Sequence, residues 1–148
     1  MNIHEERARE FFLQGYTCAQ SVILAYADEI GLDTDTAIRL GASFGGGIGR
    51  MREVCGGITG ACIVLGMLHG DYAPTDLDAK AKHYADIQAF AEAFRRENGS
   101  ILCRDLLHLD ENAPIVAKPD ARTEEYYRSR PCTNIVGTAA RLLEKWIY

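Results

Sequence analysis

The sequence predicts an all-α fold: one helical domain over residues 1–148, with about six to seven helices and a glycine-rich link. Apolar residues recur with the period of a helix, and no stretch shows the alternation that is typical of a strand. Capping residues and glycine stops recur at the spacing expected of helix boundaries. The chain has 148 residues, of which 47% are hydrophobic, and this is enough for one core of ordinary size.

Three helices are expected in the first part of the chain, over residues 3–14, 17–30 and 33–42. Gly15 stops the first helix, Thr17 can cap the second, and Gly31 ends the second. A glycine-dense segment, residues 41–50, links this group to the helices that follow. Because the segment follows a predicted helix and not a strand, it favours a turn or a close backbone approach over a phosphate-binding loop.

Four more helices are expected: from Cys55 to about residue 69, over 76–97, from a cap at Ser100, and over 131–146. Thr75 is expected to cap the longest of these. Its predicted inward-facing residues are Leu77, Ala81, Tyr84, Ile87, Ala91 and Phe94. Residues 110–120 contain two prolines and indicate a surface loop.

Composition and charge exclude several classes of partner. The net charge is −5 and no basic stripe is present, so nucleic acid is not an expected partner. The longest apolar stretch, about residues 58–68, is too short for a membrane span and is interrupted by two glycines. The charged N-terminus has no apolar signal region, and we therefore expect a cytoplasmic protein. Aromatic residues near the C-terminus are expected in the core, with a homodimer contact as the alternative.

The most informative feature is that four of the five cysteines fall in the first turn of a predicted helix. They are Cys18, Cys55, Cys103 and Cys132, with Cys103 expected at the third position of its helix. Unpaired N–H groups and the positive end of the dipole at a helix start lower the pKa of a thiol and favour the thiolate. The pattern predicts that four helix starts converge on one sulfur-rich site. Cys62, between apolar neighbours, is expected to be a small core residue.

Three segments of the chain resemble the C_GCAxxG_C_C family of redox-active proteins: residues 15–20, 45–48 and 55–60. Members carry one cysteine before a Cys-Gly-Ala-x-x-Gly motif and two after it, and the same four cysteines match in order. The motif here begins at Cys55, and its alanine is replaced by Gly57, a small-for-small change. The resemblance covers nearly the whole chain and implies redox activity.

A related domain of split-Soret cytochromes holds a two-iron, two-sulfur cluster through the corresponding cysteines. The resemblance therefore implies that the four cysteines ligate such a cluster, for electron transfer or redox sensing. The chain has no Cys-x-x-Cys-His motif, so covalent haem is not expected. Gly56 and Gly57 would let backbone N–H groups approach the cluster sulfurs, and Arg50 and Arg52 could add positive charge.

Two alternatives remain open at the level of the sequence. The first is a metal-free thiol–disulfide oxidoreductase that acts on an unidentified thiol partner. Cys55 is its expected nucleophile, because the adjacent glycines would leave it accessible. The second is a structural module in which the same cysteines bind zinc, although they lack the close Cys-x-x-Cys pairs of most zinc sites.

Overall fold

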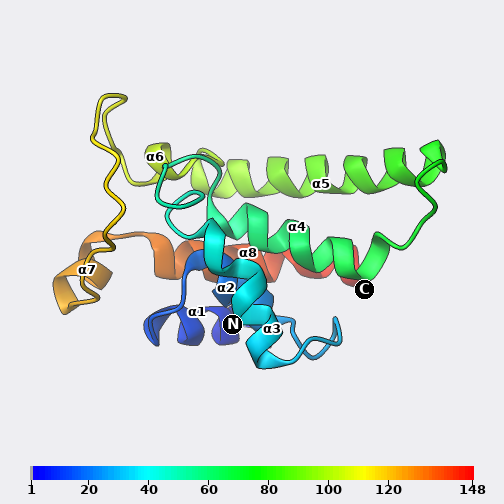
Figure 1. Cartoon of the computed structure of the whole chain (residues 1–148), viewed down its shortest axis with the longest axis horizontal. Coiled ribbons are helices and arrows are strands. Elements are labelled where there is room, and N and C mark those ends of the chain that lie inside the picture. The colour runs from blue at the N-terminus through cyan, green and yellow to red at the C-terminus, as the bar shows by residue number, and fades with distance from the viewer. Residues whose placement is uncertain (1) are drawn as a thin grey trace.

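Eight α-helices and one 3₁₀ turn make up the regular structure of the computed structural model, which describes residues 2–148 (Figure 1). Their bounds are α1 Ile3–Leu13, α2 Cys18–Ala25, α3 Thr34–Gly41, η1 Ala42–Phe44, α4 Gly56–His69, α5 Leu77–Asn98, α6 Cys103–Leu106, α7 Glu124–Ser129 and α8 Cys132–Ile147. The all-α prediction is confirmed, with one helix more than expected. The unpredicted helix, α7, is six residues long and has no buried residue, so it carries no apolar period.

The core lies between α2, α8 and the helices that pack against them. Helix α8 packs against α1, α4 and α5, and α2 packs against α1, α3 and α4. In Figure 1, α4 and α5 run side by side along the long dimension of the molecule, and α1 to α3 gather at the opposite side. The largest fully buried side chains are Tyr26, Phe12, Phe90 and Phe94. The Tyr26 hydroxyl donates to the Ala140 carbonyl at 2.6 Å and so joins α8 to the end of α2.

Several predicted boundaries are confirmed by their caps. Thr17 and Gln20 form a capping box at the start of α2. At the start of α3, the Asp33 side chain accepts a hydrogen bond from the Thr36 N–H. Gly99, at φ 94°, ends α5 in the left-handed conformation. The prediction was wrong at the end of α2, which stops at Ala25 instead of residue 30. Turns replace the last helical turn there, yet they still bury the apolar residues that suggested a longer helix.

The inward face predicted for the longest helix is only partly correct. Its N-cap is Asp76 and not Thr75. Leu77 is 73% exposed and Tyr84 56%, whereas Phe90 and Phe94 are buried. The second half of α5 therefore anchors the helix to the core, and its first half lies along the surface.

No helix within residues 2–148 combines the length and the apolar character that crossing a membrane requires.

Candidate functional site

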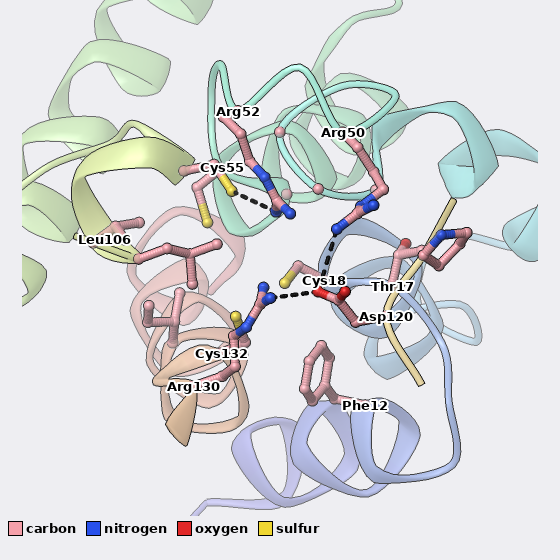
Figure 2. Close-up of a pocket in the computed structure, with 18 of the residues that line it drawn as sticks. Phe12, Thr17, Cys18, Arg50, Arg52, Cys55, Leu106, Asp120, Arg130 and Cys132 are labelled. Atoms are coloured by element: carbon pink, nitrogen blue, oxygen red, sulfur yellow. Dashed lines mark hydrogen bonds and ion pairs between the residues drawn. The ribbon is translucent and has the colours of Figure 1, made fainter. Parts of the chain in front are cut away.

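The starts of four helices meet at one cavity of about 270 Å³ (Figure 2). Cys55 is the N-cap of α4, and three cysteines are the first residues of their helices: Cys18 in α2, Cys103 in α6 and Cys132 in α8. All four line the cavity, so the predicted convergence is confirmed. The fifth, Cys62, lies within α4, is half-buried against the core and faces a different cavity.

A two-residue β-bridge holds Cys55 beside Cys103. Val54 pairs with Leu102, the Cys55 N–H donates to the Ile101 carbonyl at 2.8 Å, and the Cys103 N–H donates to the Glu53 carbonyl at 2.7 Å. This bridge delays the start of α6, so Cys103 is the first and not the third residue of its helix. The predicted cap, Ser100, instead accepts a hydrogen bond from Leu102 N–H, before the helix.

Glycines at the start of α4 bring that helix against α2. A Cβ atom on Gly56 would lie 2.6 Å from the Ala19 nitrogen and 2.7 Å from Cys18 Cβ. One on Gly60 would lie 2.8 Å from the Ala19 carbonyl oxygen. These glycines therefore permit close packing of α4 on α2, and this packing places Cys18 beside Cys55.

The glycine-rich link forms one wall of the cavity in an unusual backbone conformation. Residues 46–50 all have positive φ, including the β-branched Ile48 at 66°, which is a sterically costly position. Gly47 passes so close to α6 that an added Cβ would lie 2.7 Å from Cys103 Cβ. The link is thus shaped to pass close to the sulfur site and to carry Arg50 and Arg52 to its edge.

Arginines supply most of the charge around the cavity: Arg50, Arg52, Arg122 and Arg130 line it with one carboxylate, Asp120. Arg52 donates to Cys103 Sγ at 3.6 Å. Arg122 anchors its own segment to the end of α1, since it donates to the carbonyls of Phe12 and Tyr16 at 2.9 and 3.0 Å.

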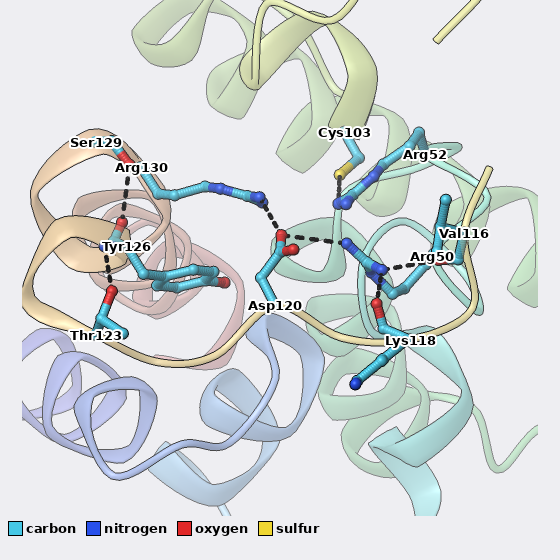
Figure 3. Close-up of polar contacts among 10 residues, drawn as sticks. All are labelled: Arg50, Arg52, Cys103, Val116, Lys118, Asp120, Thr123, Tyr126, Ser129 and Arg130. Atoms are coloured by element: carbon cyan, nitrogen blue, oxygen red, sulfur yellow. Dashed lines mark hydrogen bonds and ion pairs between the residues drawn. The ribbon is translucent and has the colours of Figure 1, made fainter. Parts of the chain in front are cut away.

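Residues 110–123, which we call the strap, run past the cavity and line part of its wall through Ala117, Pro119, Asp120 and Arg122. Figure 3 shows Asp120 of the strap between Arg50 and Arg130. Arg50 donates to the carbonyls of Val116 and Lys118, and its guanidinium lies 3.3 Å from Asp120 Oδ2. The same carboxylate oxygen accepts from Arg130 at 2.6 Å. The predicted surface loop is exposed as expected, but part of it also lines the cavity of the sulfur site, which its sequence does not indicate.

The family model for C_GCAxxG_C_C, described as "Putative redox-active protein (C_GCAxxG_C_C)", matches residues 16–146. The chain belongs to the C_GCAxxG_C_C family. Comparison with curated proteins and with solved structures finds no match. The matched range includes all four cysteines of the cavity. Within residues 2–148, no three His, Cys, Asp or Glu side chains are placed to hold a single metal ion together.

Two of the C_GCAxxG_C_C cysteines, Cys18 and Cys132, lie close enough in the cavity for each to shift the pKa of the other. The hydrogen bond with Cys18 lowers the pKa of Cys132 to about 7, and nearby Arg130, Arg122 and Arg52 also act against the effect of burial. The same hydrogen bond, together with burial, raises the pKa of Cys18. At neutral pH this pair therefore contains the most acidic thiol of the site.

Burial outweighs the helix-start effect at the other two cysteines. It raises the pKa of Cys55 to about 12, although the Gly57 N–H donates to Cys55 Sγ at 3.4 Å. It also raises the pKa of Cys103, against the opposing effect of Arg52. The expectation that each helix start would lower the pKa of its thiol was wrong for Cys18, Cys55 and Cys103. Cys55 is only 5% exposed, so its predicted role as the accessible nucleophile is also wrong.

Sequence reasoning did not find Asp120, Arg122 and Arg130 as residues of the site. Arg130 lies two positions before Cys132, and this proximity was the one available signal. Asp120 and Arg122 reach the cavity only because the fold brings the strap beside it.

Proposed function

We propose that this protein binds an iron–sulfur cluster through Cys18, Cys55, Cys103 and Cys132, and uses it for electron transfer or redox sensing. The observation that supports the proposal is the position of all four side chains around one cavity. Four thiolates are the ligand set that two-iron and four-iron clusters require. When bound, the cluster would supply a one-electron carrier.

The surroundings of the cavity suit an anionic centre. Gly57 N–H and the Arg52 guanidinium both donate to cysteine sulfur atoms. Such hydrogen bonds stabilise negative charge on sulfur and tune the reduction potential of a cluster. The Gly57 contact agrees with the backbone approach expected at residues 56 and 57, and a role of both glycines in cofactor binding remains part of the proposal.

Anaerobic purification tests this proposal. We expect brown protein with visible absorption, iron and acid-labile sulfide, and each single Cys→Ser change at the four positions should remove most of all three. Cys62→Ser is the matched control, since Cys62 lies outside the cavity, and it should retain the cluster. Colourless protein that takes up neither iron nor sulfide on reconstitution would overturn the proposal. Stoichiometric zinc without sulfide would favour a structural zinc module.

Replacing Arg52 should lower the reduction potential of the cluster. The guanidinium charge and its contact with Cys103 Sγ favour the reduced, more negative state, and Arg52→Gln removes both. A hydrogen bond to a charged group contributes about 1.5–3 kcal/mol of free energy. If half of that free energy stabilises only the reduced state, the reduction potential of a one-electron centre falls by about 30–60 mV in the variant. Spectroelectrochemical titration measures the shift. Arg39→Gln on α3, where the side chain is 80% exposed, should leave the potential unchanged. A rise, or an equal shift in both variants, would contradict the assignment.

A second candidate function, thiol–disulfide exchange, is favoured by the Cys18–Cys132 pair. The Cys132 thiolate would attack a partner disulfide and form a mixed disulfide, releasing one partner thiolate. Cys18 would then lose its proton and attack Cys132 Sγ, which releases the second partner thiolate. The partner disulfide is thereby reduced to two thiols, and the Cys18–Cys132 disulfide is formed.

Alkylation kinetics test this candidate in metal-free, reduced protein. Iodoacetamide should label Cys132 with a rate that rises to a plateau with a midpoint near pH 7, because the pKa of Cys132 is lowered to about 7. Cys55, whose pKa is about 12, should be labelled far more slowly at that pH. After treatment with oxidised glutathione, mass spectrometry should find a Cys18–Cys132 disulfide. A persistent mixed disulfide on both residues would count against exchange through this pair.

A further inference from the structure

The cavity has more positive charge than its own carboxylate can balance. Four arginines line it against one aspartate, in a chain whose net charge is −5. Arg50 and Arg130 are 16% and 23% exposed in their side chains, so much of this charge is removed from water. A concentration of guanidinium groups of this kind raises the local concentration of anions.

Two of the four arginines have donors to spare within the part of the chain that the structure describes. A guanidinium carries five N–H donors. Arg122 and Arg50 use several of theirs on backbone carbonyls of neighbouring segments. Arg52, by contrast, contacts Cys103 Sγ, and Arg130 contacts Asp120 and the ring face of Tyr126. Figure 2 shows the guanidinium groups of both pointing into the cavity.

Asp120 shows which chemical group this surface accepts. Its carboxylate lies between Arg50 and Arg130, with the same oxygen within 3.3 Å of one and 2.6 Å of the other (Figure 3). Asp120 belongs to the exposed strap, and its side chain is 49% exposed. The strap is also held through carbonyl oxygens by Arg50, so the carboxylate can leave Arg130 while the strap stays attached.

We propose that the cavity is a binding site for a small anion with a carboxylate or oxyanion group, held by Arg52 and Arg130, and that the Asp120 carboxylate competes for part of this site. Arginine binds both kinds of group through paired N–H donors. A ligand at this place would lie beside Cys132, so the substrates or effectors of the redox site would be small anionic molecules. The proposal does not require a cluster, since it rests on the arginines and the strap.

Protection from alkylation tests the site in metal-free, reduced protein. Sodium sulfate and sodium acetate serve as the oxyanion and carboxylate probes, each balanced with sodium chloride to constant ionic strength. At saturation, at least one of them should slow the labelling of Cys132 by iodoacetamide at least threefold. Arg52→Gln and Arg130→Gln should each raise the half-protecting concentration at least fivefold. The exposed Arg39→Gln should leave it unchanged.

The Asp120→Asn variant should bind the anion more tightly than the parent, which a misfolded protein would not do. Removing the competing charge should lower the half-protecting concentration of the anion severalfold, while circular dichroism stays that of the parent. The proposal is overturned if both anions fail to protect Cys132 in the parent protein and also fail in the Asp120→Asn variant. It is also overturned if protection persists unchanged in the Arg52 and Arg130 variants. Iron and sulfide content are measured separately, so a failure of the cluster proposal is distinguishable from a failure of this one.

Discussion

Gly56→Ala is expected to destabilise the protein by about 2–3 kcal/mol and to disturb the sulfur site. The added methyl group would lie 2.6 Å from the Ala19 nitrogen and 2.7 Å from Cys18 Cβ. One of these atoms is backbone and the other is fixed to it, so neither can rotate away. The start of α4 must therefore move off α2, and Cys55 moves with it, since it is the residue before Gly56.

Gly66→Ala is the matched control for this prediction. Gly66 lies in the same helix, and a Cβ atom there would meet nothing within 4 Å. Alanine has the higher helix propensity, so this variant should gain up to about 1 kcal/mol. Urea denaturation measures both changes, and alkylation of Cys18 in the native protein reports the opening at α2. Equal effects of the two substitutions on stability would show that α2 and α4 are not in the close contact described.

Local signals in the sequence were sufficient to locate three of the four helix starts at cysteines. Thr17 and Gln20 form a capping box that depends only on neighbouring residues, and it places Cys18 in the first turn. The proline before Cys132 is likewise a local signal of a helix entry, and the apolar period after Cys55 indicates the helix that begins there. The family pattern then selected the same cysteines and separated Cys62 from them.

The features of the site that the sequence did not predict depend on contacts between segments far apart in the chain. The β-bridge between residues 54 and 102 shifts the start of α6, and neither segment predicts it alone. The strap shows neither a helical nor a strand period, so nothing in it indicates that Asp120 lies between two arginines. The thiol pKa values were misjudged for the same reason. A helix start is a local feature that lowers the pKa, whereas burial is a property of the whole fold and raises the pKa of Cys55 to about 12.

The second large effect is expected at His4, for which the sequence indicated no role. The ring is 3% exposed and stacks on Tyr26 with a centroid distance of 4.0 Å. Its Nε2 lies 2.6 Å from Glu29 Oε1 and its Nδ1 lies 2.8 Å from Glu144 Oε1. His4 thus joins α1 to α8 and to the turn after α2 through its contacts with two carboxylates.

His4→Ala should cost about 2–4 kcal/mol, because it removes the stacked ring and leaves two carboxylates without their shared partner. The two Glu side chains are 28% and 32% exposed, which keeps the cost below that of a fully buried pair. Glu10→Ala, at an exposed position of the same helix, should change stability by less than about 0.5 kcal/mol. Urea unfolding at pH 7 measures both.

The contact between His4 and Glu29 also makes the stability of the folded protein depend on pH. Partial burial acts to raise the pKa of Glu29, but the hydrogen bond and charge of His4 outweigh it, so the pKa lies below its ordinary 4.5. The stabilisation from Glu29 is therefore fully present above that ordinary value, and it is lost as the pH falls through the lower pKa of the folded state. His4→Ala should remove this part of the dependence, so the difference in stability between parent and variant should shrink between neutral pH and the pH of the acid transition. A difference that stays constant over this range would show that the ring acts by packing on Tyr26 alone.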